Sequence, residues 1–93
     1  MASIDITRKH SMTNDDVKTK IEELRNDLEK KYGLECSWTS QEVLNIKGTG
    51  VKKGNISLNS GEIKVEINLS LLGSPFKSKI ESKITEYMDA NLK

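Results

Sequence analysis

The apolar residues between positions 61 and 92 follow two different spacings, one after the other. In residues 62–69 apolar and polar residues alternate, which is typical of a strand with one buried face. After Gly73 the apolar residues return at every third or fourth position, the spacing of a helix with one buried face. Ser74 and Pro75 have the residue types preferred at the N-cap and first position of that helix. The apolar stripe of the predicted helix consists of Phe76, Ile80, Ile84, Tyr87, Met88 and Leu92.

The first third of the chain contains the same two patterns. Residues 3–10 alternate and predict a strand, with Arg8 and His10 continuing its core-facing row at the edge. Residues 11–33 predict a helix, with Thr13 as its N-cap and Gly33 at its end. The apolar stripe of this helix is Val17, Ile21, Leu24, Leu28 and Tyr32.

Short alternating runs fill the middle of the chain. They predict strands at residues 34–40 and 43–48 and a fourth strand that ends at residue 58. A turn or bulge is expected within residues 48–54, and Asn-Ser-Gly at 59–61 favours a hairpin turn. The predicted order is β-α-β-β-β-β-α. We therefore expect an α+β domain spanning residues 1–93, with one curved antiparallel sheet and two helices packed on one face of it.

Composition and charge exclude several classes of protein. The 93 residues carry 15 Lys and Arg against 14 Asp and Glu, a net charge of +1, which argues against disorder and against a nucleic-acid partner. No apolar run is long enough for a membrane span or a signal peptide, so we expect a cytoplasmic protein. The one cysteine, Cys36, excludes an internal disulfide. With one histidine besides, the chain cannot supply the ligands of a closed zinc site, and we expect no metal and no cofactor.

Arg8 and His10 form the first candidate site, and Trp38 is the aromatic residue that we assign to it. Arg8 offers a fork of donors and His10 a donor or an acid/base group, which together suit a small anion such as a carboxylate. Alternatively, His10 ends the strand and hydrogen-bonds the turn before the helix. Pairing of His10 with Cys36 for nucleophilic catalysis is disfavoured, because Cys36 lies in an apolar row where a buried, inert thiol is expected. No catalytic residue is assigned.

The apolar residues around the turn at 69–76 form the second candidate site. Leu69, Leu71, Leu72 and Phe76 fall within eight positions, and Lys77 and Lys79 follow directly. Apolar residues in a loop either plug the end of the core or form a contact surface. Both alternatives are open at this point. A contact surface with lysines beside it would suit an acyl chain or a protein partner.

Several short motifs occur in order along nearly the whole chain. They are Ile4-Asp5-Ile6 in a strand that ends at His10, Tyr32-Gly33-Leu34, Trp38, Gly48-Thr49-Gly50-Val51, Gly54-Asn55-Ile56, and Leu71-Leu72-Gly73-Ser74-Pro75-Phe76-Lys77. Together these motifs resemble those of the bacterial polyhydroxyalkanoic acid system protein family, although Ser70 stands where we expect a glycine. The resemblance implies an association with polyester storage, but no established enzymatic activity or catalytic residue.

Two functions follow as hypotheses. The favoured one is a non-catalytic cytoplasmic accessory protein of the polyhydroxyalkanoate system that binds a granule surface, the polymer or a granule-associated protein. The alternative is a small ligand-binding or enzymatic domain that holds a hydroxyacyl-type carboxylate with Arg8 and His10. A third reading is a homodimer in which pairing completes a thin core.

Overall fold

The computed structural model of the chain describes residues 2–59 and 61–92. Its elements occur in the order β-α-β-β-β-β-α, and the predicted α+β fold is confirmed. A 3-10 turn, η1, precedes the second helix. The elements are β1 (Ala2–Lys9), α1 (Asn14–Tyr32), β2 (Glu35–Trp38), β3 (Val43–Lys47), β4 (Val51–Asn59), β5 (Glu62–Leu69), η1 (Ser74–Phe76) and α2 (Lys77–Asn91).

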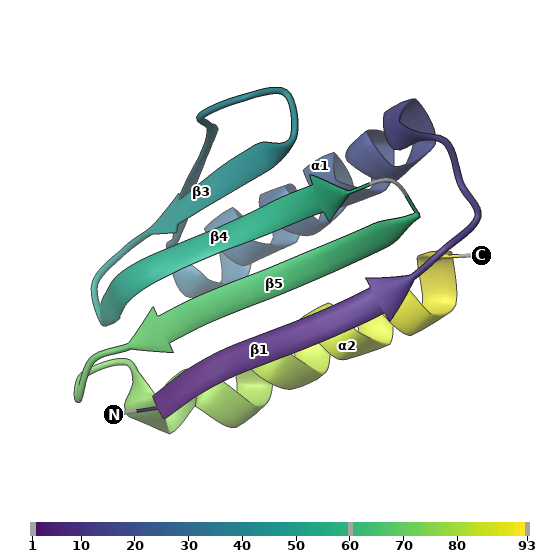
Figure 1. Ribbon diagram of the computed structural model, residues 1–93. Helices are drawn as coiled ribbons and strands as arrows, with labels where there is room; N and C mark the ends of the chain where they lie inside the picture. Colours follow the sequence, from purple (N-terminus) through teal and green to yellow (C-terminus); the bar gives the residue numbers. More distant parts are fainter. Residues whose placement is uncertain (1, 60, 93) are drawn as a thin grey trace.

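The five strands form one antiparallel sheet in the order β1-β5-β4-β3-β2 (Figure 1). Strands β2 to β5 follow one another as hairpins. Strand β1 instead lies beside β5, with Ile4 opposite Ile67. The first strand of the chain and β2 are therefore the two edges of the sheet.

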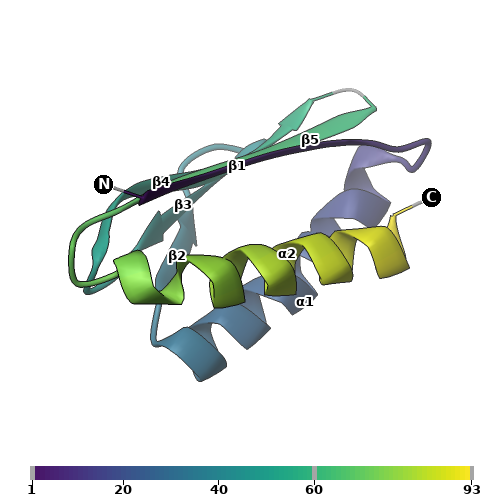
Figure 2. The same cartoon turned by 90° about the horizontal axis from the view of Figure 1, so that it is seen from below.

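Both helices cover the same face of the sheet, as predicted, and Figure 2 shows the sheet as one layer and the helices as the other. Helix α2 lies along β1, while α1 contacts β2 and β4. The apolar rows of the strands and the helix stripes meet between the layers and form one core. Its buried members are Ile4, Ile6, Val17, Ile21, Leu24, Leu28, Leu34, Cys36, Leu44, Ile46, Ile56, Leu58, Ile63, Val65, Ile67, Leu69, Ile80, Ile84 and Met88.

Helix α1 begins and ends where its sequence predicts. The Thr13 side chain accepts a hydrogen bond from the Asp16 backbone N–H at 3.2 Å, which satisfies one of the free donors of the first turn. Gly33 follows the helix with a φ of 66°, a left-handed conformation that glycine adopts without steric cost.

The start of α2 differs from the prediction. Ser74 makes no capping hydrogen bond, and Ser74–Phe76 form η1 before the α-helix begins at Lys77. The reason lies in the preceding turn, because the Ser74 N–H donates to the Ser70 carbonyl at 2.9 Å and so continues that turn. Pro75 fits this first turn, which needs no N–H at that position.

The strand limits differ slightly from the predicted ranges. Strand β2 is shorter than residues 34–40, whereas β4 begins before the predicted turn has ended. The pairing of β4 with β5 shifts between Val51 and Lys53, which is the irregularity expected within residues 48–54. The predicted turn at 59–61 contains Ser60, which lies outside the described residues, as do both ends of the predicted domain.

Candidate functional site

The segment that joins β5 to α2, residues 70–76, is here called the Leu turn. Its backbone is fixed to the connection between β3 and β4, because the Ser70 N–H donates to the Gly50 carbonyl at 2.8 Å. Within the turn, the Gly73 and Ser74 N–H groups donate to the Ser70 carbonyl at 3.1 and 2.9 Å. The Leu turn is thus held in one conformation by its own hydrogen bonds and by a neighbouring loop.

Two glycines allow this close approach. A Cβ on Gly73 would lie 2.2 Å from the Gly50 carbonyl oxygen, and a Cβ on Gly50 would lie 2.7 Å from the Gly73 Cα. Gly50 also has a φ of 88°. No side chain therefore fits between the two backbones, and the spacing of the two glycines along the chain does not reveal this contact. Ser70 serves in place of the expected glycine, because no described non-glycine residue has a positive φ.

Leu71 and Leu72 point into solvent. Their exposed fractions are 82% and 74%, and that of Phe76 is 49%. Leu69, by contrast, is 1% exposed and belongs to the core, so it cannot form part of a contact surface. Of the two alternatives for this segment, Leu71 and Leu72 do not plug the core. Together with Ser70 and Lys52 they line an open, apolar recess.

The two predicted lysines lie at the start of α2. The Lys77 ammonium is 3.7 Å from the Glu81 carboxylate, one helical turn along, and both side chains are partly exposed. The Lys79 side chain is exposed, and its backbone carbonyl accepts a hydrogen bond from the Tyr32 hydroxyl at 3.4 Å. Exposed ion pairs of this kind add little stability.

A cavity of about 200 Å³ lies between the Leu turn, the end of α1 and the end of the sheet. Its lining is mostly apolar and includes Leu34, Leu69 and Ile80 from the core. The sequence pattern predicts none of this cavity, because its walls come from segments far apart in the chain.

Arg8 lies on β1 and His10 directly follows this strand, and both side chains make contacts within the chain. The Arg8 Nε is 3.2 Å from an oxygen of Asp89 on α2. The His10 Nδ1 accepts from the Met12 N–H at 3.2 Å, which is the structural role that the sequence also allowed. Its other ring nitrogen, Nε2, is buried and bonds to no described residue. An anion site at Arg8 and His10 stays a prediction.

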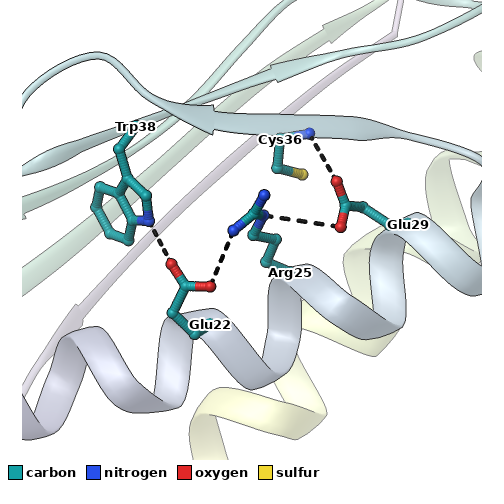
Figure 3. Close-up of polar contacts among 5 residues, drawn as sticks. All are labelled: Glu22, Arg25, Glu29, Cys36 and Trp38. Carbon is teal, nitrogen blue, oxygen red and sulfur yellow. Dashed lines mark hydrogen bonds and ion pairs between the residues drawn. The ribbon is translucent and has the colours of Figure 1, made fainter.

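Trp38 lies on β2, at the sheet edge opposite to that of Arg8 and His10, so the three predicted residues do not share one site. It belongs instead to a polar cluster between α1 and β2 (Figure 3). The Trp38 Nε1–H donates to the Glu22 carboxylate, which also accepts from Arg25 at 3.0 Å. The Lys18 ammonium lies 4.5 Å from the centre of the Trp38 ring.

The same cluster covers the free edge of β2. The Arg25 Nε lies 3.7 Å from the Glu29 carboxylate, whose other oxygen accepts the Cys36 backbone N–H at 3.3 Å (Figure 3). That N–H is then unavailable to a further strand. The hydrogen bond from Trp38 is the main cause that lowers the pKa of Glu22. The polar cluster thus has a structural role, because its contacts join α1 to the edge strand β2.

Cys36 is not placed for chemistry. Its side chain is 4% exposed, and burial raises the pKa of its thiol to about 11. A thiol with so high a pKa is a poor nucleophile at neutral pH. His10 lies beyond the opposite edge of the sheet, so the two cannot form a pair. Among residues 2–59 and 61–92, no three His, Cys, Asp or Glu side chains converge to hold a metal ion.

The comparisons with known proteins agree with the resemblance. Residues 4–92 match a family model described as "Putative polyhydroxyalkanoic acid system protein". No curated protein matches the sequence. No helix in the described part of the chain is long and apolar enough to cross a membrane. The chain belongs to the polyhydroxyalkanoic acid system protein family.

Proposed function

We propose that this chain is a non-catalytic cytoplasmic accessory protein of the polyhydroxyalkanoate storage system. It binds a granule surface, the polymer or a granule-associated protein through the Leu turn. The observation that carries this proposal is the exposure of Leu71, Leu72 and Phe76, at 82%, 74% and 49%. These are the large apolar side chains that the described part of the chain leaves exposed, and all lie in one segment.

The energetics favour such a contact. Covering an exposed leucine side chain fully contributes about 1.5–3 kcal/mol, so Leu71 and Leu72 together offer several kcal/mol. The hydrogen bond from Ser70 to Gly50 already orders the turn, so little conformational entropy is lost when a partner binds. Lys77 and Lys79 add attraction to an anionic surface, which weakens as the salt concentration rises.

The direct test is a pull-down from a host that accumulates the polyester, with granules washed at moderate salt. Wild type is compared with the double variant Leu71→Asp/Leu72→Asp. Because this variant adds two negative charges, the matched control is Asn59→Asp/Asn68→Asp, two near-isosteric changes at exposed positions of β4 and β5. All three proteins are first shown to have the same circular dichroism spectrum.

The proposal expects wild type and the asparagine control to be recovered with granules, polymer or a granule protein, and the leucine variant to be lost. Equal recovery of all three proteins, or recovery of none, would rule out the Leu turn as the binding surface. Fluorescent fusions of the same three proteins test the proposal in cells. Diffuse signal from the wild-type fusion, with no enrichment at granules, would contradict it. Sedimentation separates self-association from partner binding, since a wild-type dimer that dissociates in the leucine variant would assign the surface to a homodimer.

A further inference from the structure

The cavity beneath the Leu turn is distinct from the recess that Leu71 and Leu72 line, although Phe76 of the proposed contact surface also belongs to its lining. Leu71 and Leu72 line the outer recess and not this cavity. The cavity instead has three nearly fully buried side chains in its lining, Leu34, Leu69 and Ile80. Tyr32 and the half-exposed Phe76 contribute aromatic rings. An apolar space with such a lining holds apolar groups better than it holds water.

The charged group of this cavity is Lys31, and Thr49 adds a hydroxyl. Both residues are exposed, and a lysine side chain can lay its stem on apolar surface while its ammonium stays in water. The nearest acidic residue on the same helix face, Asp27, already pairs with Lys83 at 3.0 Å. The pKa of Asp27 is lowered mainly by its hydrogen bond with Lys83 and also by the charge of Lys31, so Lys31 lies near this pair as well. Helix α1 ends and α2 begins at this end of the molecule, so the dipoles of the two helices act in opposite directions here.

We infer that the cavity binds an unbranched aliphatic carboxylate, with the alkyl chain among Leu34, Leu69 and Ile80 and the carboxylate beside Lys31. The volume sets the length of the chain. An apolar cavity of about 150 Å³ holds the six carbons of benzene, so about 200 Å³ suits a chain of about six to eight carbons. Free fatty acids and 3-hydroxy acids share this chemistry.

The test is a titration of the full ¹⁵N-labelled chain, followed by the amide signals of Tyr32, Thr49 and Val51. The ligands are butyrate, hexanoate, octanoate and dodecanoate, each below the concentration at which it forms micelles. Each methylene that enters the cavity should tighten binding about fourfold, and the gain should end near octanoate. A continued gain through dodecanoate indicates adsorption to an open apolar surface and overturns the inference. Absence of shifts with hexanoate and octanoate also overturns it.

Two further comparisons test the carboxylate and the lysine. Octanol and octylamine should bind more weakly than octanoate, and equal binding contradicts the assigned charge. Lys31→Glu should weaken octanoate binding about fivefold, whereas the neighbouring Lys30→Glu, with the same change of helix charge, should have little effect. Equal effects of the two variants remove Lys31 from the site. A stronger response to 3-hydroxyoctanoate than to octanoate, or the reverse, identifies which source of ligand the site prefers.

A filling variant and a surface variant complete the design. Val51→Trp should fill the space and abolish the shifts; if it fails to fold, the lysine pair still decides the question. Leu71→Asp/Leu72→Asp should keep its octanoate affinity, because these side chains lie outside the cavity. A failed pull-down therefore rejects the Leu turn as a contact surface, whereas a failed titration rejects the cavity as a ligand site.

Discussion

Replacing Gly73 by alanine tests the close contact that holds the Leu turn. The new Cβ would lie 2.2 Å from the Gly50 carbonyl oxygen, and separations under 3.0 Å are essentially never seen. The two backbones must therefore move apart by at least about 0.8 Å. Such a shift stretches the hydrogen bond from Ser70 to Gly50 from 2.8 Å to beyond its useful range.

The magnitude follows from three contributions. The strain of overpacking costs about 1–3 kcal/mol, and the lost hydrogen bond about 0.5–1.5 kcal/mol. The lower entropy of the unfolded chain with alanine offsets about 0.4–1 kcal/mol of this. We expect Gly73→Ala to lower the free energy of unfolding by about 2 kcal/mol, which is a large part of the stability of a small domain.

Gly33→Ala is the matched control, because it isolates the other cost of replacing a glycine. Gly33 has a φ of 66° and no atom near its absent Cβ. Alanine at this position therefore lowers the free energy of unfolding only through its strained backbone conformation. That cost is about 1–2 kcal/mol before the same entropic offset. Gly73 has a φ of −89°, which alanine adopts freely, so Gly73→Ala lowers the free energy of unfolding only through the close contact with Gly50.

The assay is urea unfolding of wild type and both variants, with amide exchange at Ser70 measured alongside. At a slope of about 1–1.5 kcal/mol/M, Gly73→Ala should lower the midpoint by about 1–2 M. The Ser70 amide should exchange faster in Gly73→Ala and stay protected in Gly33→Ala. A Gly73→Ala midpoint equal to or above that of Gly33→Ala, with Ser70 still protected, would refute the contact.

Three further predictions concern the rest of the molecule. Burial raises the pKa of the Cys36 thiol from 9.0 to about 11. The stability that the neutral, buried thiol contributes is therefore present below about pH 9 and is lost as the pH rises toward 11. The midpoint of urea unfolding should fall over this pH range in wild type and fall less in Cys36→Ala. Glu29→Ala should lower the free energy of unfolding by about 1–2 kcal/mol and speed amide exchange at Cys36, while Glu29→Gln, which keeps an acceptor, should change both less. His10→Ala should cost about 1 kcal/mol, because the Met12 N–H loses its acceptor. A thermal shift of wild type by 3-hydroxybutyrate that His10→Ala abolishes would support the alternative ligand site at Arg8 and His10, and no shift in either protein rejects it.

Local periodicity predicts most of the fold. The strands and helices follow from spacings of two and of three or four residues, and the ends of α1 follow from Thr13 and Gly33, which act within one helical turn. The start of α2 escapes prediction because the Ser74 N–H donates to the Ser70 carbonyl of the preceding turn, while the Ser74 side chain makes no capping hydrogen bond. A capping residue type is a local signal, and here the backbone turn that begins four residues earlier continues through Ser74 instead.

The candidate site is less predictable, because its properties depend on contacts between distant segments. The spacing of Leu71 and Leu72 is the same whether they plug the core or face solvent, so the pattern leaves both alternatives open. Their exposure depends on where the Gly50–Gly73 contact places the turn. Trp38 cannot be assigned to Arg8 and His10 from sequence, because the order of strands in the sheet separates them.

The position of β1 beside β5 also bears on how the chain folds. Ile4 is opposite Ile67, so the first strand made finds its partner only after most of the chain has been synthesised. At 5–20 residues per second, this leaves β1 unpaired for about 3–12 s on the ribosome. Pairings between such distant residues also slow folding, because a large loop must close before they contribute. The N-terminal segment should thus be the last strand to dock, and destabilising β1 should raise the unfolding rate more than it lowers the folding rate.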